Sequence, residues 1–129
     1  MNWSSLIAVF LGSGLGGVCR FLISKAVQEH CASTVFPVGT FIVNVAGCFI
    51  IGLLYGLFNR FEPAAVISPQ LRLMLTVGFC GGFTTFSTFI NENYLLFQSA
   101  NLPVVLAYVT LSVAIGLLLL YAGYFLSQL

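Results

Sequence analysis

The stretch Gly78–Phe89 contains the residues of this chain that are best suited to bind ions. Its sequence, GFCGGFTTFSTF, places three glycines and four hydroxyl side chains inside an otherwise apolar run. Glycine destabilises a helix by about 1 kcal/mol relative to alanine, so the Gly81-Gly82 pair favours a break. Carbonyls left unpaired in lipid need another partner, and carbonyl oxygens bind cations. We therefore expect one monovalent cation at the break; a glycine kink used only for packing is the alternative.

The second half of this stretch has the chemistry to attract an anion. Phenylalanines recur at every third position and are expected along one helical face, with hydroxyl side chains between them. The phenylalanines are Phe83, Phe86 and Phe89, and the hydroxyl residues are Thr84, Thr85, Ser87 and Thr88. Aromatic rings have positive edges and hydroxyls donate hydrogen bonds, so together they favour an anion without holding it tightly. A phenylalanine stripe buried in a core is the competing interpretation.

Further polar side chains occur in other apolar stretches. Asn44, in GTFIVN, carries an amide that needs a partner or a polar cavity, and its NH2 group suits an anion. Tyr108 and Ser112 are four residues apart and share a helical face. For these residues, and more strongly for Thr110, a local hydrogen bond between helices is the simpler interpretation.

Two charged residues also fall inside apolar stretches. Arg20 either forms a positive vestibule that draws anions or anchors the orientation of its helix. Glu92, just beyond the phenylalanines, is the only acid within a span, and its role is left open.

The elements that hold these residues are membrane-spanning helices. Of 129 residues, 60% are hydrophobic and 5% charged, whereas about a quarter of an ordinary soluble domain is charged. A bilayer must therefore cover most of the surface. Apolar stretches of about 20 residues predict an all-α membrane protein, a single transmembrane domain whose third span is broken at mid-membrane. The predicted spans are residues 5–24, 38–58, 71–97 and 103–126.

Positive charges are balanced between the two sides of the predicted bundle. Arg20 and Lys25 lie on one side, and Arg60 and Arg72 lie on the other. Because the side richer in Lys/Arg normally stays in the cytoplasm, this balance favours insertion in both orientations and an antiparallel homodimer. A weakly biased single orientation is the alternative. Gly12/Gly16 and Gly52/Gly56 have the GxxxG spacing of close helix packing, either between subunits or within one.

Several functional classes are excluded by composition. A net charge of +1 without a Lys/Arg-rich run leaves no surface for nucleic acid. The four cysteines lie far apart and are expected to be packing residues. No set of residues for acid-base or nucleophilic catalysis falls at one membrane depth, so no enzyme activity is expected.

Gly78–Phe89 and GTFIVN resemble the Fluc (CrcB) family of small microbial fluoride channels, and length, spans and charge balance match over the whole chain. The resemblance implies a dual-topology homodimer with two antiparallel fluoride pores in a bacterial plasma or inner membrane, giving fluoride resistance. It places Asn44, Phe86 and Phe89 in the pore and Arg20 in a vestibule. It assigns Thr85, Ser87, Thr88, Tyr108 and Ser112 to a polar track. A structural sodium ion would bind the backbone carbonyls of Gly81 and Thr84 at the dimer interface.

Some features depart from the family or leave other functions open. Where some relatives carry a second hydroxyl one turn after Ser112, this chain has Gly116, and Glu92 matches an acid found only in some members. A small dual-topology drug exporter would need a buried carboxylate, for which Glu92 is the only candidate. A non-transporting membrane subunit is the other alternative.

Overall fold

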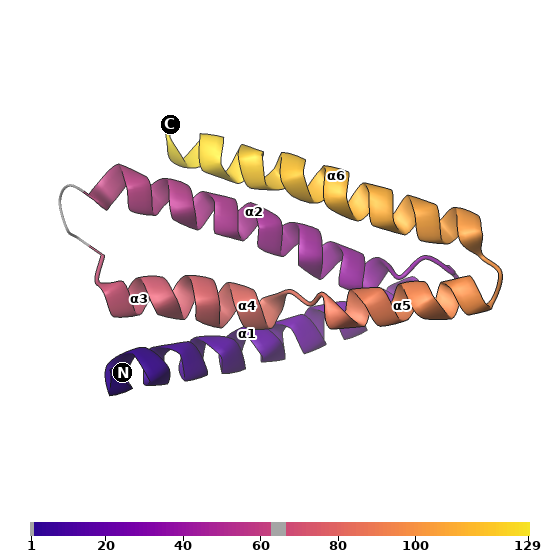
Figure 1. Ribbon diagram of the computed structural model, residues 1–129, viewed down its shortest axis with the longest axis horizontal. Coiled ribbons are helices and arrows are strands. Elements are labelled where there is room, and N and C mark those ends of the chain that lie inside the picture. Colours follow the sequence, from indigo (N-terminus) through magenta and orange to yellow (C-terminus); the bar gives the residue numbers. More distant parts are fainter. Residues whose placement is uncertain (1, 63–66) are drawn as a thin grey trace.

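The computed structural model describes residues 2–62 and 67–129 as four helical rods. Four helices are long and apolar enough to cross a membrane: Trp3–His30, Val38–Phe61, Pro69–Gln98 and Leu102–Ser127. Their elements are α1 (Trp3–His30), α2 (Val38–Phe61), α3 (Pro69–Leu73), η2 (Met74–Cys80), α4 (Gly81–Phe83), α5 (Ser87–Gln98) and α6 (Leu102–Ser127). Figure 1 shows the rods running along a common axis, with both termini at one end. The predicted all-α class and the number of spans are confirmed.

The third span is assembled from several pieces. The π-helical stretch η2 follows α3, and after α4 the chain leaves the helix before α5 begins at Ser87. The span is bent there, as predicted, but the site of the break differs from the prediction. Gly81 and Gly82 are helical, and the non-helical residues follow Phe83. Gly82 is instead needed for packing, because an added Cβ would meet the Ser13 carbonyl oxygen of α1 at 2.5 Å, whereas a Cβ on Gly81 would meet no atom closer than 4.0 Å.

The first helix is longer than the predicted residues 5–24. It continues through Lys25 to His30, whose ring nitrogen lies 3.0 Å from the Ala26 carbonyl oxygen. Lys25 lies above the ring of Phe21 at 5.8 Å. Polar residues continue the helix beyond its apolar part, so the hydropathy of the span underestimates its length.

Glycines close the seam between α2 and α6, which lie side by side in Figure 1. A Cβ on Gly52 would overlap the Leu120 carbonyl oxygen, and one on Gly123 would overlap the Phe49 carbonyl oxygen. Gly56 lies against the side chain of Ser127. The backbones therefore approach as closely as glycine allows, which is how helices associate without a hydrophobic drive.

The other glycine pair packs α1 against the third span. A Cβ on Gly12 would overlap the Met74 carbonyl oxygen, and one on Gly16 would overlap the Phe79 carbonyl oxygen. Both GxxxG pairs are thus used within one chain, the second of the two possibilities raised by their spacing. This packing fixes the distance of α1 from the break.

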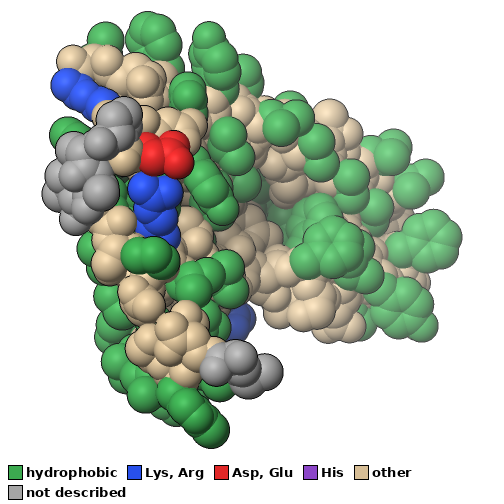
Figure 2. All heavy atoms as spheres, turned by 60° about the vertical axis from the view of Figure 1, so that its left-hand side comes forward, with side chains coloured by type: hydrophobic (Ala, Val, Ile, Leu, Met, Phe, Trp, Pro, Cys, Tyr) green, Lys and Arg blue, Asp and Glu red, His purple; other side chains and the backbone are tan. Residues whose placement is uncertain are grey.

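The outer surface is largely apolar. Figure 2 shows mostly hydrophobic side chains on the face in view, with only a few charged ones. Large side chains such as Phe10, Leu117 and Tyr121 are more than half exposed along the rods. Such a surface is suited to lipid and not to water.

Candidate functional site

The break in the third span is a short extended segment between α4 and α5. Thr84 has φ −95° and ψ 162°, which is extended backbone. Its amide and its hydroxyl both donate to the Cys80 carbonyl oxygen, at 3.0 and 2.9 Å. These two hydrogen bonds end the first half of the span, and the next two residues lead the chain into α5.

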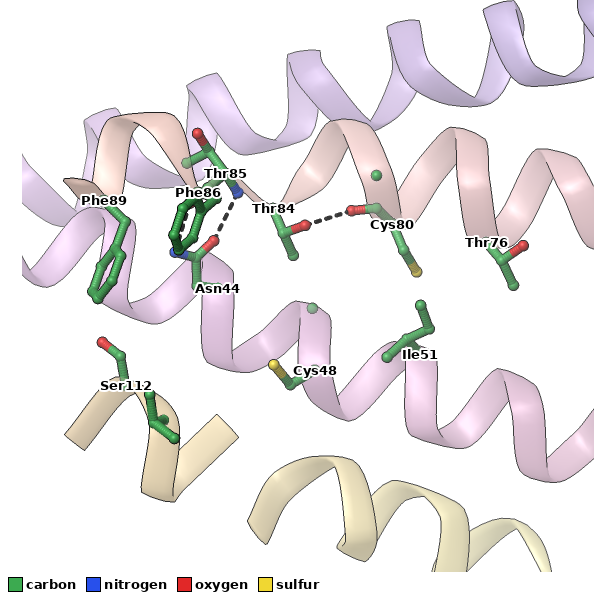
Figure 3. Close-up of a pocket in the computed structure, with 13 residues that line it drawn as sticks. Asn44, Cys48, Ile51, Thr76, Cys80, Thr84, Thr85, Phe86, Phe89 and Ser112 are labelled. Carbon is green, nitrogen blue, oxygen red and sulfur yellow. Dashed lines mark hydrogen bonds between the residues drawn. The ribbon is translucent and has the colours of Figure 1, made fainter. Parts of the chain in front are cut away.

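Asn44 of α2 holds the middle of the break. Its Nδ2 donates to the Thr85 carbonyl oxygen at 3.0 Å, and its Oδ1 accepts from the Thr85 amide at 2.8 Å (Figure 3). The side-chain amide thus pairs with Thr85 as another peptide group would. One N–H of Asn44 is used in this pairing, and the second is left to donate elsewhere.

Arg20 of α1 holds the end of α4. Its Nε donates to the Gly82 carbonyl oxygen at 2.9 Å. The Arg20 side chain is half-buried, so the residue predicted to line a vestibule reaches the break itself.

A cavity of about 410 Å³ lies along the break, between α2, the third span and α6. Figure 3 shows side chains from all three spans around it. Seven of the predicted site residues line it: Asn44, Gly81, Thr84, Thr85, Phe86, Phe89 and Ser112. Among the residues that the structure describes, no charged side chain lines this cavity. Its polar groups are amides and hydroxyls, which suit a small ion that has lost its water.

Ser112 supplies a hydroxyl that has no partner. Its Oγ is buried and makes no hydrogen bond within the described part of the chain. A buried hydroxyl without a partner is uncommon, because burial removes its bonds to water. At Gly116, one turn later, an added Cβ would lie 3.2 Å from the Cys48 sulfur. A larger residue at Gly116 would therefore crowd Cys48, and the row of hydroxyls ends at Ser112.

Two of the three phenylalanines meet at the cavity. Phe86 and Phe89 have ring centroids 6.1 Å apart, tilted by 39°. Phe86 is 74% exposed and Phe89 only 8%, so Phe86 stands at the open side. The expected continuation of this stripe to Phe83 is wrong, because the break separates them and Phe83 stacks on Phe79 at 5.6 Å. The three-residue spacing assumed one continuous helix.

Glu92, in the middle of α5, accepts two hydrogen bonds. The Tyr108 hydroxyl donates to Oε1 at 2.9 Å, and the Thr40 hydroxyl donates to Oε2 at 3.0 Å. Tyr108 is fully buried and packs edge-on against Phe89, with centroids 4.8 Å apart. The hydroxyl predicted to lie on a polar track is therefore bound to a carboxylate and does not line the cavity.

A second hollow of about 330 Å³ lies next to Glu92. It is bounded by the end of α1, the following loop and α5. Phe89 lines the first cavity and Glu92 lines this one, three residues further along α5. The two openings are thus separated by the packing of Phe89 on Tyr108.

Two polar residues near the site were not predicted from the sequence, and some predicted residues lie outside the cavity. Thr40 stands one turn before Asn44 on the same face of α2, a spacing that points to it. Asn93 was also missed; it is buried, its Nδ2 donates to the Phe89 carbonyl oxygen, and its Oδ1 has no partner in the described residues. Ser87 and Thr88 are exposed and line neither cavity.

The carbonyl groups at the break have the chemistry of a cation site. In a continuous helix, Gly81 and Thr84 would accept from the amides of Thr85 and Thr88. Those amides donate instead to Asn44 Oδ1 at 2.8 Å and to the Thr85 hydroxyl at 3.3 Å. Both carbonyl groups have lost their helical donors, and both residues line the cavity. The donor set fits a hard monovalent cation.

Comparison with known proteins identifies the family of this chain. The family model described as "CrcB-like protein, Camphor Resistance (CrcB)" matches residues 7–124. The chain belongs to the CrcB family. It is therefore a multi-pass membrane protein of bacterial type, with four helices long enough to span.

Named relatives of this CrcB protein cover nearly its whole length. It is 44% identical over 124 residues to "Fluoride-specific ion channel FluC" of Phocaeicola vulgatus, covering 96% of this chain and 98% of the relative. The protein of the same name from Flavobacterium psychrophilum is 39% identical over 124 residues, covering 96% and 97%. "Fluoride-specific ion channel FluC 1" of Yersinia pseudotuberculosis is 45% identical over 112 residues, covering 87% and 84%. These names are those of ion channels and not of enzymes.

Proposed function

We propose that this CrcB protein is a fluoride-selective channel that lets fluoride leave the cell passively and so protects it from fluoride toxicity. Its relatives carry the name of such a channel. The observation that carries the proposal is the uncharged cavity at the break, where the unpartnered Ser112 hydroxyl faces the same space as Phe86 and Phe89.

The cavity offers fluoride a substitute for its water. Moving an unpaired ion into a medium of low dielectric costs on the order of tens of kcal/mol. The Ser112 hydroxyl and the second N–H of Asn44 donate to the ion, and ring edges of Phe86 and Phe89 add weak positive potential. Because no charged side chain of residues 2–62 and 67–129 lines the cavity, the ion is held loosely enough to leave.

The channel works as an antiparallel homodimer with two pores. The support is the open side of the break, where Phe86, Ser87 and Thr88 are all exposed on a single chain. Irregular backbone does not face lipid within a membrane, so another protein surface must cover the break. A second copy in the opposite orientation meets this need, and the balanced Lys/Arg distribution permits both orientations.

The carbonyl oxygens of Gly81 and Thr84 would hold a structural sodium ion at the dimer interface. Its support is the loss of both helical donors at these carbonyl groups. These carbonyl oxygens would replace part of the hydration shell of the ion, and the ion would supply the positive charge that the two unpaired carbonyl groups favour. The residues of the chain then keep the break rigid, so that Thr85 and Phe86 stay at the cavity wall.

The test is fluoride efflux from liposomes that contain only the purified protein. Vesicles loaded with potassium fluoride receive a potassium ionophore, and a fluoride electrode follows the loss; chloride-loaded vesicles run in parallel. We expect rapid fluoride loss and no chloride loss. Absence of fluoride efflux from folded protein would reject the channel function and favour an exporter or a non-transporting subunit.

One serine variant and one threonine variant in α6 make the test specific to the cavity. Ser112→Ala removes one donor to the ion and is expected to slow fluoride efflux about tenfold, since about 1.4 kcal/mol corresponds to a factor of ten. Thr110→Ala is the matched control, because Thr110 is exposed on the same helix and lines neither cavity. Equal fluoride efflux rates for the two variants would mean that the cavity is not part of the fluoride pathway.

A further inference from the structure

The Arg20 side chain is hydrogen-bonded to the backbone at the break in the third span and is not an isolated charge. Its Nε lies 2.9 Å from the Gly82 carbonyl oxygen, across 62 positions of sequence. In a continuous helix this carbonyl would accept from the Phe86 amide. Because Thr84 is extended, that amide has moved away, and Arg20 supplies the donor in its place.

The close packing of α1 on α4 fixes the position of Arg20. Gly16 stands one turn before Arg20, and its missing side chain allows contact with the backbone of Phe79. From the other side, Gly82 leaves room for the backbone of Ser13 and Gly17. The guanidinium is therefore carried to the break by two backbones in contact.

The bond also suits the electrostatics of the helix end. The carbonyl end of a helix carries about half a negative elementary charge, and a cation there is favourable. A charge-assisted hydrogen bond to an otherwise unpaired carbonyl is stronger than a neutral one. Asn44 holds the opposite side of the break through Thr85, so α1 and α2 fix the segment from two directions.

We propose that Arg20 is a positioning residue of the fluoride pathway. Through the Nε–H bond to Gly82 it fixes the end of α4, and thereby the placement of Thr84, Thr85 and Phe86 at the cavity. This role differs from that of a vestibule charge that attracts anions, and it rests on the proposed channel function.

Three substitutions separate the bond from the charge. In Arg20→Gln the amide nitrogen occupies the place of Nε, so the donor stays and the charge is lost. In Arg20→Lys a methylene group occupies that place and the ammonium lies one atom further, so the charge stays and the donor is displaced. In Arg20→Met a methyl group occupies the place, and both are lost.

The measurement is fluoride efflux per folded protein at low and high ionic strength. We expect Arg20→Gln to stay within about threefold of the unsubstituted protein, and Arg20→Lys and Arg20→Met to lose at least about tenfold at both ionic strengths. A vestibule charge predicts the reverse: Lys active, Gln and Met equally slow, and the defect reduced by salt. That reverse order would overturn the proposal, as would loss confined to the amount of folded protein with unchanged efflux per channel.

The outcome remains readable if one variant misfolds or if the channel function fails. Should Arg20→Met not fold, the comparison of Gln with Lys decides by itself. If the unsubstituted protein conducts no fluoride, the channel proposal fails; the bond is then tested by thermal unfolding in detergent. Gln melting above Lys supports the bond, and Lys melting at or above Gln overturns it.

Discussion

The seam between α2 and α6 and the break in the third span are both held in place within the bundle, but by different means: backbone contact at the seam and side-chain hydrogen bonds at the break. At the seam, Gly52 and Gly123 bring two regular helices into backbone contact. At the break, the backbone is irregular, and Asn44 and Arg20 reach across to satisfy it. A space of about 410 Å³ lies beside the break, and neither Gly52 nor Gly123 lines it.

The difference shows where this fold gives up packing for polar chemistry. Backbone contact needs only the absence of a side chain, because a continuous helix satisfies its own hydrogen bonds. An open segment must find a partner for each backbone group, since lipid provides none. Stability should therefore depend on shape at the seam and on hydrogen-bond donors and acceptors at the break.

The largest expected effect comes from filling the seam. In Gly52→Ala the added Cβ would overlap the Leu120 carbonyl oxygen, so the two helices must move apart. We expect the free energy of unfolding to fall by about 3 kcal/mol, the upper part of the usual range for overpacking. Denaturation in SDS, followed by circular dichroism, measures the change.

Gly14→Ala is the control for this substitution. A Cβ on Gly14 meets nothing within 4 Å, so only the helix propensity changes. A gain of up to about 1 kcal/mol is expected. If Gly52→Ala were tolerated as well as Gly14→Ala, the seam would not depend on backbone contact.

An intermediate effect is expected at the break. Asn44→Leu keeps the size of the side chain but leaves the Thr85 amide and carbonyl group without their partner. Two lost hydrogen bonds lower the free energy of unfolding by about 2 kcal/mol. Fluoride efflux per folded protein should also fall, because Thr85 lines the cavity.

Asn59→Leu serves as the matched control on the same helix. Asn59 is exposed, and its contact with the Tyr124 hydroxyl is long, at 3.4 Å. A change below about 0.5 kcal/mol and normal efflux are expected, as for most surface sites. Comparable losses of unfolding free energy in the two variants would mean that the pairing of Asn44 with Thr85 stabilises the protein no more than a surface contact does.

The seam was easier to predict from sequence than the break, and the reason is physical. Hydropathy locates the four spans, because lipid selects apolar residues along their whole length. The glycine spacing indicates close packing, although only the structure shows which helix each pair meets. Residue types also pointed to the cavity, since Asn44, Phe86 and Ser112 are conspicuous in an apolar chain.

The exact position of the break and the partners of the polar groups could not be predicted. Gly81-Gly82 looks like a break by helix propensity, but tertiary contact with Ser13 uses Gly82 inside the helix. The pairing of Glu92 with Thr40 and Tyr108 joins three helices. Such bonds depend on rotation and crossing of the helices, which a local pattern does not contain.

The smallest expected effect lies in the turn that joins the two regions, between α5 and α6. Ala100 has a φ of 62°, in the left-handed region that disfavours a Cβ. The Asn101 amide donates to the Leu96 carbonyl oxygen at 2.9 Å and the Ala100 amide to that of Phe97 at 3.1 Å, a Schellman end in which glycine is preferred. Ala100→Gly should therefore raise the free energy of unfolding by about 0.5 kcal/mol, relief of strain exceeding the added entropy of the unfolded chain. Fluoride efflux should not change, because the turn touches neither the seam glycines nor the cavity.

Ala122→Gly, on the exposed face of α6, is the control and should instead destabilise the protein by about 1 kcal/mol. Opposite signs for one substitution at two sites would show that the SDS titration resolves backbone effects smaller than those expected at the seam and the break; a loss in both variants would contradict the left-handed turn.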